Sequence, residues 1–416
     1  MTSAEVAAEG PVVVPLSEDR LRRVVAVLSY TEIVSWGILF YAFTVLAPSI
    51  RDREGWPLTH LMAVFTMTQV VGAASGLWVG RRLDRVGPRS VMTAGSALGV
   101  LAVVLVAAAP TFTAYVGAWV LMGVAMSATL YAPAFTVLTH WAGARRVHAL
   151  TVVTLVAGLA STVFAPIAAV LESQGSWRTT YLVLAVPLAS TVLVHWRGLD
   201  DPWVVTETAE EHADGRTRSR TSELVRSPEF VLVVGAFTLA GFCVYAAVVN
   251  LVPLLTAAGL STVAAAVALG VGGAGQVAGR LLYEPVLARL RVRPRTVLVV
   301  GVAALTTVAL AASARFVVLA CLASFAAGVA RGIFTLIQAT AVSDRWGTRD
   351  FGARSALLTG SVMVAAAFSP WLGALLASLL DGYGTAFVVV AVGAGIAALV
   401  LARLPGPDEP GEPRAA

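Results

Sequence analysis

Apolar runs long enough to cross a bilayer follow one another along almost the whole chain. A helix crosses the hydrocarbon core in about 20 residues. Twelve such runs lie near 24–48, 58–79, 90–109, 114–139, 148–171, 179–196, 229–255, 260–281, 296–313, 316–341, 355–380 and 384–402. With 58% hydrophobic and 13% charged residues, the chain is too apolar for a soluble globule. Helices satisfy every backbone polar group inside a membrane, so we predict an all-α membrane protein with twelve transmembrane helices.

The loop charges predict the orientation of the chain. All 29 basic residues are arginine. Those on the first side are Arg20, Arg22, Arg23, the cluster within 81–89, Arg145, Arg146, the arginines of 216–220, those of 289–295, Arg345, Arg349 and Arg354. Arg51, Arg53, Arg178 and Arg315 fall on the opposite side. The positive-inside rule therefore places the first side, with both termini, in the cytoplasm of a bacterial cell. The same bias explains a pI near 9.6 without a nucleic-acid partner.

The chain repeats itself after about half its length. Gly37-x3-Tyr41-Ala recurs as Gly241-x3-Tyr245-Ala, and Gly76-x3-Gly80-Arg recurs as Gly275-x3-Gly279-Arg. Such duplication predicts two pseudo-symmetric six-helix bundles. We expect a cytoplasmic tail at 1–23, bundles at 24–196 and 228–403, a charged cytoplasmic linker at 197–227 and a second tail at 404–416.

The turn between the second and third runs carries the most specific motif, Gly80-x3-Asp84-Arg85-x-Gly87-x-Arg89. Gly87 permits a tight reversal and Pro88 suits the first turn of the next helix. The motif resembles motif A of major facilitator superfamily transporters, which implies that fold and a latch formed by these five residues. Asp84 needs a positive partner: Arg85, Arg89 or a helix N-terminus. A short basic loop that only fixes orientation is the alternative. The second copy has Tyr283-Glu284 instead of Asp84-Arg85, so a second latch, around Glu284 and Arg289, is weakly signalled.

Two ionisable residues lie deep inside predicted spans, Glu32 in the first and Arg331 in the tenth. A charge at the centre of a membrane helix costs roughly 2.5–3.5 kcal/mol, so each should face a partner or a wet cavity. The resemblance implies that the first, fourth, seventh and tenth helices line a central cavity. We hypothesise that Arg331 attracts an anionic substrate, while Glu32 exchanges a proton or pairs with Arg331 in the empty site. A structural ion pair is the alternative.

Secondary candidates for the substrate pathway lie on the same four spans. They are Tyr41, Tyr131, Tyr245, Asn250 and Gln338 as hydrogen-bonding groups, and Trp36 as a packing surface; ordinary helix packing is the alternative for each. Gln276-x3-Arg280 resembles the Asp-x3-Arg segment of monocarboxylate transporters, in which the arginine contacts a carboxylate. A substrate or gating role for Gln276 and Arg280 therefore competes with a boundary role, since Arg280 is the repeat mate of Arg81.

The sequence carries no phosphate-binding loop, nucleophile elbow or metal-ligand spacing, so we expect no enzymatic activity, metal or cofactor. Cys243 and Cys321 fall in apolar runs, and the five histidines fall in loops or at span ends. No histidine is therefore expected to carry protons inside a span.

These observations predict a secondary active transporter that moves a small solute across the cytoplasmic membrane by alternating access. The segment from Ser35 to Trp56, and Arg145-Arg146 followed by Pro166 and Trp177-Arg178, resemble the monocarboxylate and oxalate–formate branch, which implies an organic anion, with proton coupling. A proton-driven drug or metabolite efflux pump is one alternative, and a non-transporting sensor is another. We expect the substrate, protons and the bilayer as partners, and a functional monomer.

Overall fold

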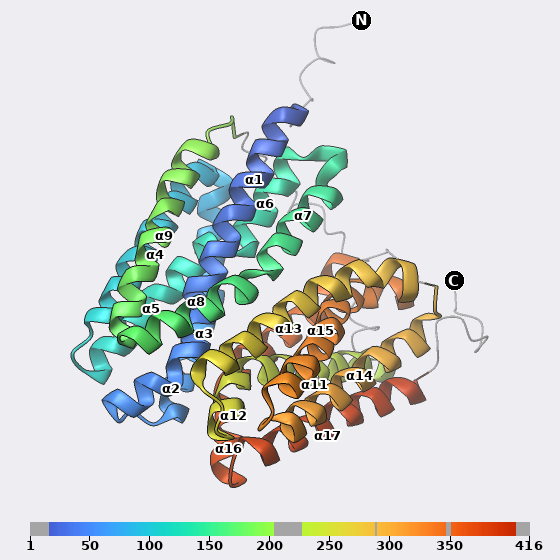
Figure 1. Ribbon diagram of the computed structural model, residues 1–416. Helices are drawn as coiled ribbons and strands as arrows, with labels where there is room; N and C mark the ends of the chain where they lie inside the picture. The colour runs from blue at the N-terminus through green and yellow to red at the C-terminus, as the bar shows by residue number, and fades with distance from the viewer. Residues whose placement is uncertain (1–15, 204–226, 288, 347–350, 405–416) are drawn as a thin grey trace, which may run out of the picture. The chain divides into compact units, whose positions relative to one another are not determined.

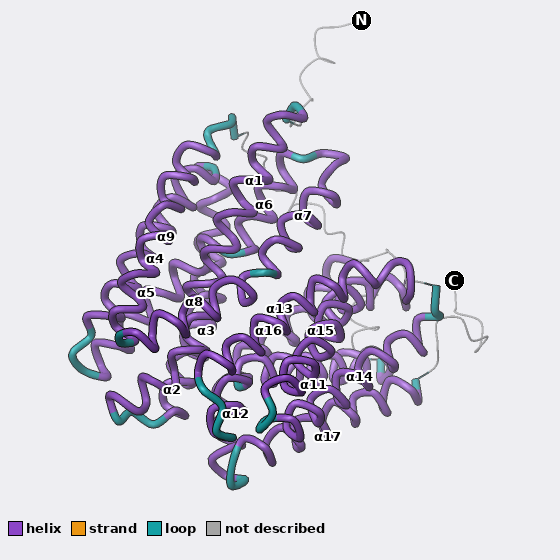
Figure 2. Tube along the Cα trace, viewed as in Figure 1, coloured by secondary structure: helices purple, strands orange, loops and turns teal. Residues whose placement is uncertain are grey.

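The computed structural model describes residues 16–203, 227–287, 289–346 and 351–404, and it is helical almost throughout that part of the chain (Figures 1 and 2). Twelve of its helical segments are long and apolar enough to cross a membrane. The predicted all-α architecture with twelve transmembrane helices is confirmed. The tails at 1–15 and 405–416, most of the predicted linker (204–226) and Arg349 lie outside the described residues.

The first six spans are built from eleven helical pieces. These are α1 (Glu18–Ser35), η1 (Trp36–Tyr41), α2 (Ala42–Glu54), α3 (Leu58–Val86), α4 (Pro88–Ala108), α5 (Phe112–Thr129), α6 (Tyr131–Trp141), η2 (Gly143–Arg145), α7 (Arg146–Gly158), α8 (Ala160–Gln174) and α9 (Trp177–Gly198). Three of these spans are interrupted: the first by the π-helix η1, the fourth by extended Leu130 and the fifth at Leu159.

The last six spans follow from residue 228. They comprise α11 (Pro228–Val249), α12 (Leu251–Ala257), α13 (Thr262–Leu282), η4 (Tyr283–Leu287), α14 (Val292–Ser313), α15 (Val317–Trp346), α16 (Phe351–Leu379) and α17 (Tyr383–Arg403). Asn250 separates α11 from α12.

The chain divides into two compact units that do not follow the sequence repeat. Unit 1 is Met1–Phe40, Thr68–Ala160 and Trp177–Glu211; unit 2 is Tyr41–Met67, Ser161–Ser176 and His212–Ala416. The division cuts the first span inside η1 and the fifth span next to its interruption. Unit 2 therefore contains one end of the first, second and fifth spans together with the last six spans. The predicted division at 197–227 stays a prediction.

Glycines let two helices of unit 2 pack backbone to backbone. A Cβ atom added at Gly275 or Gly279 of α13 would overlap with the carbonyl oxygens of Phe325 and Val329 on α15. A Cβ atom at Gly328 of α15 would overlap with the carbonyl of Gly272 in return. Small residues at such a crossing allow close van der Waals contact in a membrane. The α13–α15 pair is therefore joined over most of its length.

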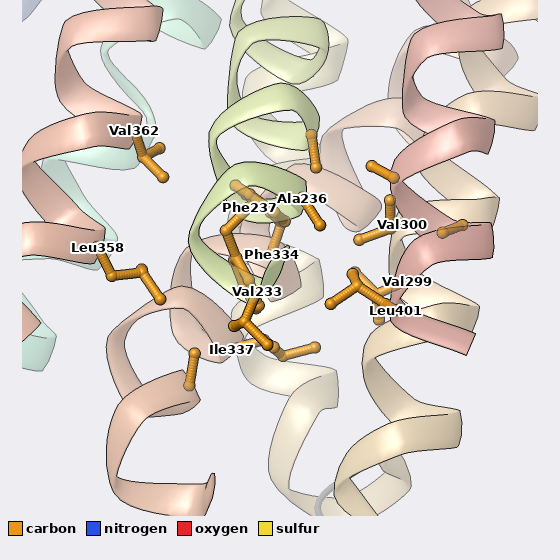
Figure 3. Close-up of a cluster of buried hydrophobic side chains, with 14 of the residues drawn as sticks. Val233, Ala236, Phe237, Val299, Val300, Phe334, Ile337, Leu358, Val362 and Leu401 are labelled. Carbon is orange, nitrogen blue, oxygen red and sulfur yellow. The ribbon is translucent and has the colours of Figure 1, made fainter. Parts of the chain in front are cut away.

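The main apolar core of unit 2 lies on the other side of α15. Val233 and Phe237 of α11 meet Phe334 and Ile337 of α15, and the ring centroids of Phe237 and Phe334 are 5.9 Å apart (Figure 3). Val299 and Val300 of α14, Leu358 and Val362 of α16 and Leu401 of α17 complete this cluster. The core fixes the rotation of α15 about its axis, and with it the direction in which Arg331 faces.

The glycines Gly72, Gly76 and Gly80 of the second span differ in what lies next to them. Gly72 of α3 lies against the backbone of Gly123 in α5, with 3.2 Å from an added Cβ atom to the Gly123 carbonyl oxygen. A Cβ atom at Gly76 or Gly80 meets nothing within 4 Å in the part of unit 1 that the structure describes. Among the described residues, Gly72 is therefore the glycine of this stripe that touches a neighbouring helix.

Candidate functional site

Glu32 lies in unit 1, near the end of α1, with none of its surface exposed. Neither carboxyl oxygen has a hydrogen-bond partner among the described residues. The indole of Trp36, one turn further along, lies close to the carboxyl group without reaching hydrogen-bond geometry. The hydroxyls of Ser29 and Ser35 are also buried without partners. A buried polar group without a hydrogen bond is costly, so this cluster is suited to bind a proton, water or a solute.

An aromatic cluster lies beside this polar cluster. The ring of Trp36 lies 5.0 Å from Tyr131 and 5.3 Å from Phe40, and Tyr131 stacks on Phe135 at 5.1 Å. Trp36 opens the π-helix η1, and Tyr131 opens α6 directly after the extended residue Leu130. Interruptions of this kind are common at functional sites. Unit 1 thus brings together Glu32, Trp36 and Tyr131 of the predicted residues.

Arg331 lies in unit 2, on α15, and is 4% exposed. Its Nη2 donates to Oε1 of Gln276 on α13 at 2.9 Å, whereas its Nε has no partner. Among the described residues no carboxylate forms an ion pair with it. Within the described part of the chain, the hydrogen-bond partner of this buried charge is thus a neutral amide.

Tyr245 links Arg331 to two further candidates. Its phenol group lies within electrostatic range of Arg331, of Arg280 and of Tyr41. Tyr41 and Tyr245 occupy equivalent places in the sequence repeat, and both belong to unit 2. Arg280 thus reaches the surroundings of Arg331, although it is also the last basic residue of α13. Two arginines, two tyrosines and Gln276 gather in one part of unit 2.

A small cavity of about 30 Å³ lies next to Arg331. Its walls are mostly alanine, valine, leucine and glycine from α11, α12, α13, α14 and α15. Thr306, Thr307 and Ser324 add hydroxyl groups. The hydroxyls of Thr306 and Thr307 donate to carbonyls of their own helix. Their oxygen atoms can therefore still accept hydrogen bonds from other donors. A cavity needs about 10–15 Å³ to hold one water molecule, so this one has room for one or two.

Asn250 and Gln338 have surroundings unlike those of the other candidates. Asn250 is 1% exposed, and its Nδ2 donates to the carbonyls of Ala246 at 3.0 Å and Ser369 at 3.4 Å. These contacts tie the break between α11 and α12 to α16, which is a packing arrangement. Gln338 is half-buried on α15, two turns beyond Arg331.

The motif of the second loop forms a tight turn at the end of α3. Gly87 has φ 80°, in the left-handed region that glycine tolerates, and Pro88 opens α4. Arg89 was a predicted partner of Asp84. Instead, its Nε donates to the Trp196 carbonyl at 2.8 Å, and its guanidinium lies 4.0 Å above the Trp196 ring.

The other members of the motif are at the surface. Asp84 and Arg85 are exposed, and among the described residues no cation forms an ion pair with Asp84. Its carboxylate is within electrostatic range of His140. The predicted second latch stays a prediction, because the side chain of Glu284 lies outside the described set.

Sequence reasoning missed two well-ordered polar contacts in unit 1. His195 is completely buried, and its Nδ1 lies 2.8 Å from the hydroxyl of Ser96 on α4. Trp203, five residues beyond α9, donates its indole N–H to the Asp84 carbonyl at 2.9 Å. A histidine at a span end and a tryptophan in a polar stretch carry no periodic signal that predicts such contacts.

The fold and these sites define a multi-pass, all-helical membrane protein. The family model of the Major Facilitator Superfamily matches residues 25–321 and 282–416. The chain therefore belongs to the Major Facilitator Superfamily, a family of transporters. Comparison with curated protein sequences finds no match.

Solved structures agree with this fold. A bacterial homologue of the human lysosomal transporter Spinster, in an inward-facing and unoccupied conformation, is similar with a TM-score of 0.76 and 14% identity over 93% of this chain and 97% of that one. A D-xylose–proton symporter is similar with a TM-score of 0.71 and 13% identity over 93% and 98%. At these identities the likeness concerns the fold.

Proposed function

We propose that this protein is a secondary active transporter of a small organic anion, such as a monocarboxylate. The observation that carries the proposal is the buried guanidinium of Arg331, which contacts the neutral amide of Gln276 and has a free Nε. A charge inside a membrane protein is stable when an opposite charge or water compensates it. Carboxylates are natural partners for guanidinium because both groups are planar and bind through two parallel hydrogen bonds.

The residues near Arg331 favour the monocarboxylate and oxalate–formate branch. Arg280 supplies a second positive charge, and the phenol groups of Tyr41 and Tyr245 supply neutral donors. The apolar cavity next to Arg331 suits a short substituent on the carboxylate. A hydrophobic drug cation would instead meet two positive charges here. These two charges favour the anion carrier over the drug efflux pump.

Glu32 is the proposed proton carrier of the cycle. Among the described residues of unit 1 its carboxyl group has no basic partner, and burying an unpaired carboxylate is costly. Contact with water or substrate during the cycle would let the proton leave. This step couples solute movement to the proton gradient.

Contacts at one end of unit 2 support alternating access. Thr162 of α8 donates to the Gly270 carbonyl of α13 at 2.8 Å, and the Trp371 amide of α16 donates to the Thr66 hydroxyl of α3 at 3.4 Å. Each contact joins a span of the first sequence repeat to a span of the second. In the proposed topology, with both termini and the Gly80–Arg89 loop in the cytoplasm, these contacts lie toward the outer side. We infer that they close the path on that side and must break when it opens.

Uptake into proteoliposomes tests the proposal. The purified protein is expected to accumulate labelled short-chain carboxylates when the pH gradient is imposed, and to ignore labelled hydrophobic cations. Arg331→Ala should abolish uptake. Accumulation of cations instead of carboxylates would establish the efflux alternative, and binding of carboxylates without any uptake would establish a sensor.

A further inference from the structure

The five residues after α9, residues 199–203, lie at the end of unit 1 that carries the turn between α3 and α4. Leu199 is 1% exposed and joins the apolar cluster that includes Met92 and Trp141. Asp201 accepts from Arg23 at 2.9 Å, and its side chain is 4% exposed. The indole N–H of Trp141 donates to the Pro202 carbonyl at 3.1 Å. These contacts hold the segment from Leu199 to Trp203 in one place.

Trp203 ends this segment and contacts the motif A turn directly. Its indole N–H donates to the Asp84 carbonyl at 2.9 Å. Its side chain covers Gly87 so closely that a Cβ atom there would lie 3.0 Å from the Trp203 Cβ and Cγ atoms. The ring also stacks on His140 of α6, with centroids 4.0 Å apart and planes 23° apart.

The hydrogen bond to Asp84 acts as a cap on α3. The last four carbonyls of a helix have no partner inside it, and Asp84 provides one of these four in α3, which ends at Val86. The neighbouring Leu83 carbonyl already accepts from the Gly87 amide at 2.8 Å. A donor at the C-terminus of a helix also interacts favourably with the helix dipole. The indole therefore fixes the backbone from which the Asp84 carboxylate projects.

We propose that Trp203 is a positioning residue for motif A: it holds the turn between α3 and α4 from the linker side and sets where Asp84 is presented. The inference rests on the latch role that the family resemblance gives to motif A. Displacement of the Leu199–Trp203 segment releases this turn, so the start of the linker takes part in transport.

Amide hydrogen exchange of the purified full-length protein tests the contact without any solute. Trp203→Phe keeps an aromatic ring beside His140 and removes the indole N–H, whereas Trp203→Ala removes both. The amides of residues 83–87 should exchange about fivefold faster in Trp203→Phe, as expected for loss of one hydrogen bond, and faster still in Trp203→Ala. Trp346→Phe, a span-end tryptophan of unit 2, is the matched control and should leave these amides unchanged. Wild-type exchange in both Trp203 variants would overturn the inference.

Transport kinetics separate positioning from simple stability. Trp203→Phe should lower the maximum uptake rate several-fold with an unchanged KM, as should Asp84→Asn. The two substitutions together should be no worse than Asp84→Asn alone. If both Trp203 variants have the wild-type maximum uptake rate while Asp84→Asn is slow, the positioning role is overturned and the latch role stands. A wild-type rate in Asp84→Asn would overturn the latch itself.

Discussion

Arg331 and Gln276 meet through one hydrogen bond of 2.9 Å between two helices that pack backbone to backbone. The bond joins a buried cation to a neutral acceptor, so the charge of the guanidinium remains available to a mobile anion.

The first prediction changes that acceptor into an acid. Gln276→Glu puts a carboxylate within hydrogen-bonding distance of Arg331, and this internal ion pair competes with an anionic substrate. We expect the KM for carboxylate uptake to rise at least about tenfold, because a buried charge-assisted bond exceeds a neutral one by more than ~1.4 kcal/mol. Gln276→Met, which is neutral and of similar size, is the control for the charge. An unchanged KM in Gln276→Glu would argue against substrate binding at Arg331.

The second prediction concerns proton coupling. Glu32→Gln keeps the shape of the buried side chain and removes its ability to release a proton. Accumulation driven by a pH gradient should disappear, whereas exchange of labelled for unlabelled substrate at equal pH should continue. Asp52→Asn, which neutralises an exposed acid of the same span, should behave as wild type. Gradient-driven accumulation by Glu32→Gln would exclude Glu32 as the proton carrier.

The third prediction uses the crossing of α8 and α13. A Cβ atom at Gly273 would overlap with the Ser161 hydroxyl and lie 2.7 Å from the Thr162 hydroxyl. Gly273→Ala should therefore hinder closure of this crossing and slow uptake, and Ser161→Ala in the same chain should restore part of the rate. Initial uptake rates measure both effects. Equal rates in Gly273→Ala and wild type would contradict the closing role of this contact.

The fourth prediction concerns stability. Gly328→Ala forces α15 away from α13, because the new methyl group overlaps with the Gly272 carbonyl. Such overpacking costs about 1–3 kcal/mol, so the melting temperature in detergent should fall. Gly301→Ala on α14 is the matched control, since its Cβ atom meets nothing within 4 Å. A melting temperature as high as that of the control would disprove the close contact.

The fifth prediction tests the cavity as a limit on substrate size. Ala303→Val narrows the cavity and Leu310→Ala widens it. Acetate, propionate, butyrate and hexanoate are tested as competitors of carboxylate uptake. The preferred competitor should be shorter in Ala303→Val and longer in Leu310→Ala than in the wild type. If the wild type and both variants transport carboxylates with the same chain-length preference, the substituent of the carboxylate binds outside this cavity.

The sequence predicted the elements more reliably than their contacts. Twelve apolar runs, the turn at Gly87 and the isolated charges Glu32 and Arg331 are all visible in a linear pattern. The surroundings of Arg280 depend on how α11 and α13 pack, and the sequence left two roles open for this residue. Gly76 looked equivalent to Gly72, but a stripe of small residues does not specify which neighbour it meets.

Contacts between distant segments had no signal at all. Trp203 meets His140, Gly87 and Asp84, which lie between 63 and 119 residues earlier in the chain, and only the tertiary fold brings them together. The π-helix at Trp36–Tyr41 is similar: its sequence is that of an ordinary apolar helix, and the extra residue per turn follows from packing.

The backbone contact between α13 and α15 has a consequence for how this site evolves. Gln276 and Arg331 lie on two helices that are in contact through their carbonyls and glycine Cα atoms. Because of this contact, neither helix can slide or rotate to fit a different solute. Any change of specificity at Arg331 has to come from exchanging side chains on a fixed frame, which leaves few neighbouring positions able to redirect it.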